Sequence, residues 1–197
     1  MSLPEIEKNS SSGTQPSAQR SLISYTVVAL GLALFVRFFV ASPYVVIGAS
    51  MEPNFDNYHY LIIDRVTYRF FEPVRGDVIV LDLPQETSRA LIKRVIGLPG
   101  DTIVLSGQNV TVINTQYPDG LKLSEPYLDP KNLGGVNELR VTLGKDEYFV
   151  LGDNRRVSSD SRIWGTLPRN DIVGRVFARL YPFGKIGLFP NEARYTQ

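Results

Sequence analysis

The chain has 197 residues, of which 43% are apolar and 21% charged, a composition typical of one globular domain with appendages. Its net charge of +1 provides no basic surface of the kind that binds nucleic acid, so we expect no nucleic-acid partner. The absence of cysteine excludes thiolate chemistry, and the single histidine, His59, excludes a site built from several histidines. The carboxylates show no metal-ligand spacing, so we expect neither a metal nor a cofactor.

The N-terminal part divides into a polar tail and an apolar run. Residues 1–20 are rich in Ser, Pro and Gln without apolar periodicity, which predicts a disordered tail. From Leu22 to Val40 nearly every residue is apolar, and about 20 such residues suffice to cross a hydrocarbon core of about 30 Å. Arg37 lies near the end of this run, where its side chain can reach the headgroups. The pattern predicts a transmembrane signal anchor over 21–42; a buried core helix and a cleaved signal peptide are the alternatives.

From residue 43 onward, short β-type runs alternate with turn signals. Because no long helical pattern lies between them, we expect an all-β body of mostly antiparallel strands over 43–197, shaped like a barrel or a sandwich. Residues 117–137 contain several prolines and predict a loop. Apolar and β-branched runs predict strands at 44–47, 60–66, 78–81, 91–96, 147–151 and 172–181, and a hairpin from 102–105 and 110–113.

The first candidate for chemistry is Ser50, in a turn that follows the apolar run. A serine hydroxyl is a weak nucleophile until a base takes its proton. Gly48 allows close approach of the backbone, and a turn leaves N–H groups free to bind an oxyanion. Ser50 could equally be one turn serine among several. His59 is the only histidine that could serve it as a base.

The second candidate is Lys93, in the apolar run from Leu91 to Ile96. With a period of two, neither face of this strand is plainly polar. Burial disfavours a charged ammonium and lowers the pKa of a lysine, which makes its neutral amine available as a general base. An edge-strand lysine with its amine in water is the alternative that the pattern leaves open.

A third cluster, from Gly152 to Gly165, is dense in Asp, Arg and Ser. It is either a solvated loop or a set of hydroxyls and carboxylate–guanidinium pairs that hold a catalytic lysine in place. The residue types alone leave both interpretations open.

Taken together, four ordered segments resemble the boxes of the type I signal peptidases, the membrane-anchored serine proteases that remove signal peptides from exported proteins. Ser50 to Pro53 (SMEP) resembles the nucleophile box, and Arg75 to Val80 (RGDVIV) resembles the next box. Lys93 to Asp101 resembles the box with the general base, and Gly152 to Gly165 resembles the last one. The resemblance extends from about Pro43 to Phe189.

The resemblance implies a role for each matching position. Ser50 would be the nucleophile that forms an acyl-enzyme, and Lys93 would be the general base of a Ser-Lys dyad. Ser158 would hydrogen-bond the lysine amine and orient it, and the Ser50 N–H would be one oxyanion donor. The structural supports would be Arg94, Asp153, Asp160 and Arg162.

Two positions depart from the family's pattern. Asn54 stands where the nucleophile box usually continues with threonine. Some members have a serine two residues before the nucleophile, and its hydroxyl is the second oxyanion donor. Gly48 has no hydroxyl, so a backbone N–H or a water molecule would replace it.

The resemblance also implies partners and location. Exported preproteins with small residues before the cut would bind as an added strand, beside shallow apolar pockets near 44–47 and Lys93. The chain would be a single-pass protein of the cell membrane, with its tail in the cytoplasm and its body outside; a thylakoid membrane is the alternative. From composition alone, we expect the lipid bilayer to contact an apolar rim formed by Phe70, Phe71 and Trp164.

Two other functions fit part of the pattern. One is a self-cleaving Ser-Lys protein, similar to the SOS repressors in its catalytic core; the anchor and the missing DNA-binding region argue against it. The other is a noncatalytic, membrane-tethered binding domain, which explains the anchor and the β body but not the four boxes.

Overall fold

The structure is a computed structural model, and it describes residues 18–35, 37, 41–83, 86–191, 193 and 195. Its contacts divide the chain into two units, residues 1–36 and 37–197. Residues 1–17 of the predicted tail lie outside the described residues, and a helix begins at Ala18, inside the segment predicted as tail.

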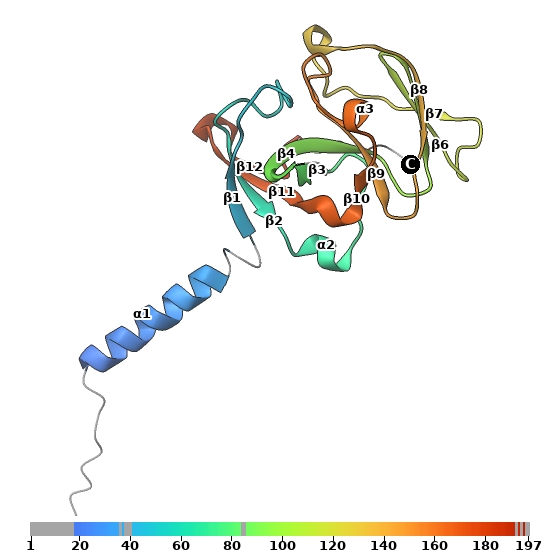
Figure 1. Cartoon of the computed structure of the whole chain (residues 1–197). Coiled ribbons are helices and arrows are strands. Elements are labelled where there is room, and N and C mark those ends of the chain that lie inside the picture. Colours follow the sequence, from blue (N-terminus) through green and yellow to red (C-terminus); the bar gives the residue numbers. More distant parts are fainter. Residues whose placement is uncertain are drawn as a thin grey trace, which may run out of the picture. The chain divides into compact units, whose positions relative to one another are not determined.

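The first unit contains the helix α1, Ala18–Phe35 (Figure 1). Its apolar side chains are exposed along the helix, from Leu22 at 66% to Leu34 at 45%. In the part of the chain that the structure describes, we find no helix both long and apolar enough to span a bilayer. Residues 36 and 38–40, which belong to the predicted anchor, lie outside the described residues.

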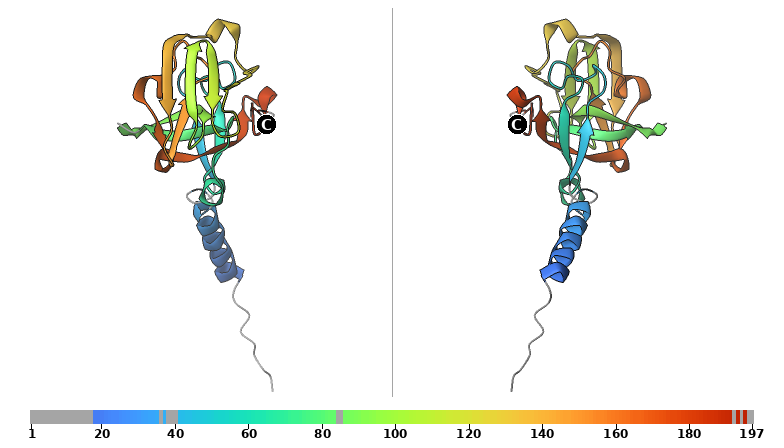
Figure 2. Two further views of the ribbon diagram at one scale, coloured as in Figure 1. Left: turned by 90° about the vertical axis from the view of Figure 1, so that its right-hand side faces the viewer. Right: turned by 90° about the vertical axis from the view of Figure 1, so that its left-hand side faces the viewer.

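The second unit contains two antiparallel sheets (Figures 1 and 2). The larger sheet has eight strands: β1 (Ala41–Val45), β2 (Tyr60–Asp64), β3 (Val78–Leu83), β4 (Glu86–Gly97), β9 (Glu147–Leu151), β10 (Leu167–Pro168), β11 (Ile172–Tyr181) and β12 (Gly187–Leu188). Their order is β1-β2-β11-β3-β4-β9-β10, with β12 paired to β11. The smaller sheet has the order β7-β6-β5-β8, from β5 (Thr102–Gly107), β6 (Asn109–Ile113), β7 (Leu121–Lys122) and β8 (Val136–Thr142).

The predicted all-β, antiparallel body is confirmed, but its barrel form is wrong. Over the described residues, the larger sheet ends at β1 and β10 and the smaller one at β7 and β8, so neither sheet closes. The edge strand β10 is two residues long and contains Pro168, which has no N–H to continue the pairing.

Short helical segments connect the strands. They are α2 (Thr67–Phe70), α3 (Ser161–Trp164), η2 (Pro130–Asn132), η3 (Arg169–Asp171) and η4 (Phe183–Lys185). The helix α3 is capped by Asp160, whose side chain accepts a hydrogen bond from the backbone N–H of Arg162.

All of the predicted strands are present; those at 147–151 and 172–181 have the predicted bounds, and the others have shifted ends. The first strand occupies Ala41–Val45 instead of 44–47, and β4 begins at Glu86 instead of Leu91. The segment predicted as a loop, 117–137, contains β7 and η2, and it runs into β8, which the sequence did not predict. No side chain of β8 is fully buried, so this strand lacks the strong apolar signal of the others.

Three apolar clusters form the core of this unit. One of them joins the segment after β1 to the larger sheet: Met51 and Phe55 are both 0% exposed and pack with Leu61, Ile63 and Val78. Burial of a side chain of this size is worth about 1.5–3 kcal/mol. The residues beside Ser50 are therefore anchored in the core.

A second cluster attaches the smaller sheet to the ends of β4 and β9. It includes Ile103 and Val112 from the smaller sheet, with Ile96 from β4 and Phe149 and Leu151 from β9. This packing holds the smaller sheet against β9 and against β4, the strand that carries Lys93.

Candidate active site

Ser50 and Lys93 lie side by side in the structure, although 43 residues separate them in the sequence. The Lys93 Nζ donates a hydrogen bond to Ser50 Oγ at 3.0 Å and another to the carbonyl oxygen of Ile92 at 2.8 Å. Because β4 lies between β3 and β9, Lys93 is in the interior of the sheet and is only 1% exposed. The alternative of an edge-strand lysine with its amine in water is therefore excluded.

Backbone hydrogen bonds on both sides hold the Ser50 turn. The segment between β1 and β2 is closed by hydrogen bonds from Val46 N to the His59 carbonyl, at 2.9 Å, and from Tyr58 N to the Val46 carbonyl, at 2.8 Å. The carbonyl of Ser50 itself accepts from Asn154 N at 3.0 Å. The turn is therefore tied to the Gly152–Gly165 cluster through main-chain atoms.

Gly152 lies between this turn and Ser158. A Cβ on Gly152 would lie 2.5 Å from the Ser50 carbonyl oxygen and 2.1 Å from Ser158 Oγ, so only glycine allows both groups to approach. Ser158 Oγ is buried and has no hydrogen-bond partner among the described residues. The predicted hydrogen bond from Ser158 to the Lys93 amine is not formed in this structure.

Asp160 and Arg162 fix the chain around Gly152. Asp160 is 0% exposed and accepts a hydrogen bond from Gly152 N at 3.0 Å. The same carboxylate accepts from Arg162 Nε at 2.7 Å and Nη2 at 2.8 Å. These charge-assisted bonds hold the backbone that contacts Ser50.

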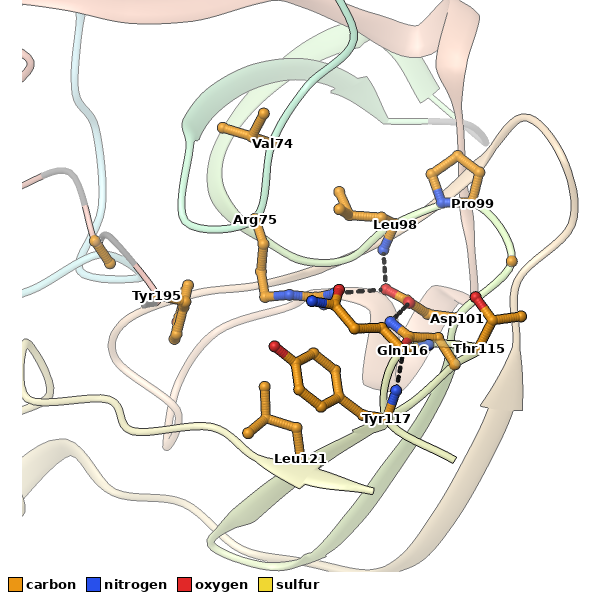
Figure 3. A pocket seen from close by; sticks show the side chains of 13 residues that line it. Val74, Arg75, Leu98, Pro99, Asp101, Thr115, Gln116, Tyr117, Leu121 and Tyr195 are labelled. Atoms are coloured by element: carbon orange, nitrogen blue, oxygen red, sulfur yellow. Dashed lines mark hydrogen bonds and ion pairs between the residues drawn. The ribbon is translucent and has the colours of Figure 1, made fainter. Parts of the chain in front are cut away.

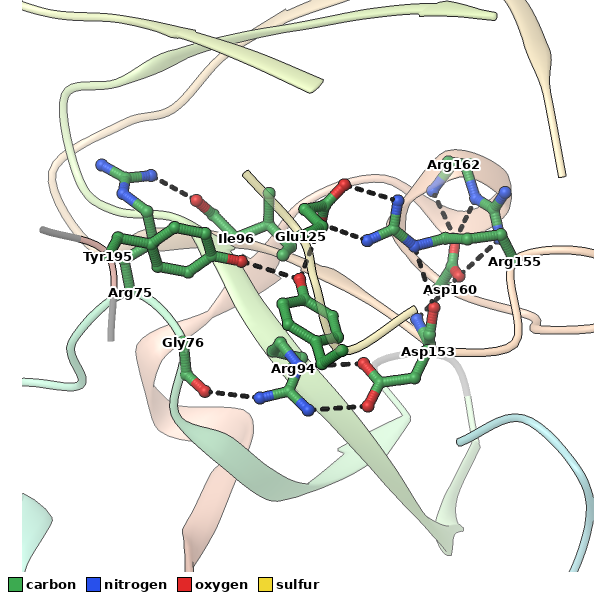
Figure 4. A network of polar contacts seen from close by, with 12 residues as sticks. Arg75, Gly76, Arg94, Ile96, Glu125, Asp153, Arg155, Asp160, Arg162 and Tyr195 are labelled. Atoms are coloured by element: carbon green, nitrogen blue, oxygen red, sulfur yellow. Dashed lines mark hydrogen bonds and ion pairs between the residues drawn. The ribbon is translucent and has the colours of Figure 1, made fainter. Parts of the chain in front are cut away.

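Arg94 and Asp153 form a second, fully buried pair (Figure 4). Arg94 donates to the two carboxylate oxygens of Asp153 at 2.9 and 2.7 Å. Burial lowers the pKa of Arg94, but the hydrogen bonds and charge of Asp153 outweigh it and the pKa is raised overall. Arg94, the residue after Lys93, therefore stays charged. The carboxylate of Asp153 neutralises that charge.

An apolar cavity of about 220 Å³ opens beside Ser50. It is lined by β1 and the residues after it, by β2 and β3, and by β4: Tyr44, Val45, Val46, Ile47, Ser50, Leu61, Val80, Ala90, Leu91 and Ile92. The sequence predicted pockets near 44–47 and Lys93, and the cavity lies there. It is large enough for small side chains next to the serine.

Comparison with known proteins identifies the family. Residues 19–181 match the family model described as signal peptidase, peptidase S26. The chain belongs to this family. It is a serine peptidase that removes signal peptides from secreted preproteins.

Individual signal peptidases are similar in sequence to most of this chain. A probable signal peptidase I-2 from Synechocystis sp. is 37% identical, over 85% of this chain and 75% of that protein. Signal peptidase I from Leptolyngbya laminosa is 34% identical, over 93% of this chain and 92% of that protein. A signal peptidase I of known crystal structure, from Enterococcus faecalis V583, aligns with a TM-score of 0.45 and 30% identity, over 54% of this chain and 97% of that one.

The two departures from the signal peptidase pattern have structural explanations. The Gly48 N–H donates to Asn57 Oδ1 at 3.0 Å, and Gly48 has a φ of +108°, which favours glycine. Asn54 Nδ2 donates to the Tyr127 carbonyl at 3.0 Å and to Asp153 Oδ2 at 2.8 Å. Sequence reasoning assigned no role to Asn54; its place in the nucleophile box was the only signal.

His59 is not placed to serve this signal peptidase as a base. Its ring is buried, and Nδ1 accepts a hydrogen bond from Asp56 N at 3.2 Å. Burial, with a smaller effect of Arg179, lowers the pKa of His59. The histidine therefore belongs to the turn before β2, and the side chain that contacts the Ser50 hydroxyl is Lys93.

A larger cavity, of about 820 Å³, lies elsewhere on the peptidase (Figure 3). Neither Ser50 nor Lys93 lines it, and its charged residues Arg75 and Asp101 neutralise each other at 2.9 Å. Within the described ranges, no group of three or more His, Cys, Asp or Glu residues could hold a metal ion. Of these two cavities, only the smaller one is lined by Ser50, so we take it as the candidate substrate site.

Proposed function

We propose that Ser50 is the nucleophile and Lys93 the general base of this signal peptidase, acting through an acyl-enzyme. The observation that carries the proposal is the 3.0 Å contact between Lys93 Nζ and Ser50 Oγ inside the sheet. A buried amine favours its neutral form, and a neutral amine can accept the hydroxyl proton. The Ile92 carbonyl, bonded to the same amine at 2.8 Å, orients it toward Ser50.

The reaction then has two halves. Ser50 Oγ attacks the carbonyl carbon of the scissile bond while its proton passes to Lys93 Nζ. Lys93 returns that proton to the leaving amine, the C–N bond breaks, and the signal peptide remains as an ester on Ser50. A water molecule, deprotonated by Lys93, attacks the ester carbonyl; the C–O bond to Ser50 breaks, Lys93 returns the proton to Ser50 Oγ, and the signal peptide leaves with a free carboxyl group.

The oxyanion would be bound by the Ser50 N–H. Among the described residues, nothing accepts a hydrogen bond from this N–H, so it is available to the substrate. The Gly48 N–H is engaged by Asn57. The second donor is therefore a water molecule or another backbone N–H.

Ser158 would orient the lysine amine after a rotation of its side chain. Its hydroxyl is buried without a partner and lies against Gly152, which also contacts the Ser50 carbonyl. Buried hydroxyls are rarely left unsatisfied, which supports a partner that Ser158 gains during the reaction.

The substrate would bind as an extended strand beside the cavity at Ser50. Residues of β1 and β4 line that cavity, and an extended peptide between them would place alternate side chains in it. The limited volume of about 220 Å³ supports a preference for small residues before the cut.

We also propose that residues 21–42 anchor the enzyme in the cell membrane, with the N-terminal tail in the cytoplasm and the peptidase domain, 43–197, outside. The exposed apolar side chains of α1 support this, since a helix that is apolar on all sides needs a lipid or protein environment. Phe70 and Phe71, 76% and 69% exposed, would contact the bilayer. Trp164 is partly buried against a core cluster, so we do not include it in the proposed bilayer contact.

The test of the dyad uses a preprotein whose signal peptide ends in Ala-x-Ala. We expect Ser50→Ala and Lys93→Ala each to abolish its cleavage, whereas Ser106→Ala, at an exposed serine of β5, cleaves at the normal rate. Lys93→Arg should also be inactive, because a guanidinium does not deprotonate in proteins. Cleavage retained in Ser50→Ala or Lys93→Ala would refute the dyad.

A further inference from the structure

Asn191, in the segment after β12, bridges the two segments that carry Ser50 and Lys93. Its carbonyl oxygen accepts a hydrogen bond from Arg94 Nη1 at 2.8 Å, and Arg94 follows Lys93 on β4. Its side-chain Nδ2 donates to the Asn54 carbonyl at 2.8 Å, and Asn54 belongs to the segment that Ser50 begins. One residue thus contacts both segments without touching either member of the dyad.

The Asn191 carbonyl adds to the buried partners of Arg94, of which Figure 4 shows Gly76 and Asp153. Arg94 is 0% exposed, and its Nη1 also donates to the Gly76 carbonyl at 3.0 Å. Its guanidinium lies 4.0 Å from the centre of the Tyr127 ring. Without the Asn191 carbonyl, an N–H of a buried cation would lose its partner.

The contact with Asn54 closes a ring of hydrogen bonds. The Asn54 side chain donates to Asp153 at 2.8 Å, and Asp153 holds Arg94. The next residue, Asn154, binds the Ser50 carbonyl through its backbone N–H. A displacement of Asn191 would therefore reach Ser50 and β4 together.

Two further contacts hold this part of the chain in place. A Cβ on Gly76 would lie 1.9 Å from the Ala193 carbonyl oxygen. Only glycine at position 76 therefore lets the backbone at Ala193 pack this closely against the Arg75–Val80 segment. The Tyr195 hydroxyl lies 2.7 Å from that of Tyr127, and the Tyr195 ring packs against the core. Burial raises the pKa of Tyr195 to about 12, so this hydroxyl stays neutral at working pH.

We propose that Asn191 is a positioning residue for signal-peptide cleavage, which sets the distance between the nucleophile and the base. The inference rests on the proposed Ser50–Lys93 dyad. Catalysis depends steeply on such distances, since a misplacement of about 1 Å can cost about 100-fold in rate. The substrate cavity includes neither Asn191 nor its two partners, so substrate binding should not depend on it.

The decisive variant is Asn191→Gly. Asn191 has a φ of +57°, which glycine adopts readily, so this change keeps the backbone carbonyl for Arg94 and removes only the link to Asn54. We expect kcat for the preprotein to fall about 10-fold, with KM unchanged. A chain ending at Pro190 loses both links, and its kcat should fall about 100-fold.

The matched control is Asn170→Gly, at an exposed asparagine far from these contacts in the sequence, and it should keep the normal kcat. Thermal unfolding of each variant shows whether it is folded at the assay temperature. A folded Asn191→Gly chain with normal kcat overturns the inference, whether or not the shortened chain folds. A loss of kcat that disappears when the assay is cooled, in step with recovered folding, also overturns it, because the role is then structural only.

The outcome for Asn191 can be separated from that for the dyad. If Lys93→Ala cleaves the preprotein, the dyad is wrong, whatever Asn191→Gly does. If Lys93→Ala is inactive and Asn191→Gly has normal kcat, the dyad stands and only the positioning role of Asn191 is lost.

Discussion

Arg94 meets Asp153 through two hydrogen bonds, of 2.9 and 2.7 Å, in a part of the molecule where both side chains are at most 1% exposed. Arg94 follows Lys93 on β4, and Asp153 precedes the residue that binds the Ser50 carbonyl. The ion pair therefore connects the strand that carries Lys93 with the segment that binds the Ser50 carbonyl. Loss of one partner leaves a buried charge uncompensated.

We expect Asp153→Ala to lower the free energy of unfolding by about 3–5 kcal/mol, because Arg94 would remain buried without its carboxylate. Urea unfolding measures this directly. Asp119→Ala, at an exposed turn, should change the free energy by less than about 0.5 kcal/mol. Equal effects of the two substitutions would show that the buried pair contributes nothing specific.

The pH dependence of cleavage should distinguish lysine from histidine as the base. If Lys93 acts as a neutral amine, kcat/KM rises with pH along a single ascending limb. His59→Asn keeps an acceptor for Asp56 N and removes the only imidazole, so it should leave this limb in place. Disappearance of the limb in His59→Asn would assign it to the histidine instead.

His59 should instead affect stability. Its pKa in the folded chain is lowered below the ordinary value of 6.5, chiefly by burial, so the unfolded chain binds the proton more readily. Its contribution is present above pH 6.5 and is lost as the pH falls below it, with a slope of at most about 1.4 kcal/mol per pH unit. Urea unfolding from pH 7 to 5 should give a flatter curve for His59→Asn; identical curves would contradict this.

Gly152→Ala should impair catalysis through the backbone of the nucleophile. The added Cβ would meet the Ser50 carbonyl oxygen at 2.5 Å and Ser158 Oγ at 2.1 Å, so the turn must move. We expect kcat to fall by about 100-fold. Gly184→Ala, where a Cβ meets nothing within 4 Å, is the control and should cleave normally. Normal cleavage by Gly152→Ala would mean that the Ser50 turn adapts without cost.

Most of the longer strands and the four boxes could be predicted from local patterns, since alternation and motif order are properties of short segments; β8, without a buried side chain, could not. The burial of Lys93 could not. Whether a lysine lies on an edge or in the middle of a sheet depends on which strands pair beside it, and the partners of β4 come from residues 78–83 and 147–151.

The roles of Asn54 and Asn191 were also missed, for different reasons. Asn54 stands where the family has threonine, so the motif gave no guidance on what the amide contacts. Asn191 lies beyond Phe189, where the resemblance ends, and its two partners are 97 and 137 residues away in the sequence. Such contacts follow only from the assembled fold.

The hydrogen bond from Asn154 to the Ser50 carbonyl uses main-chain atoms on both sides. Ser50 contributes only its main-chain carbonyl, which every amino acid carries, so replacement of the Ser50 side chain leaves the bond intact. An inactive Ser50→Ala chain should therefore keep the shape of the wild-type cavity beside residue 50. It is a suitable trap for crystallising an intact preprotein in the act of binding.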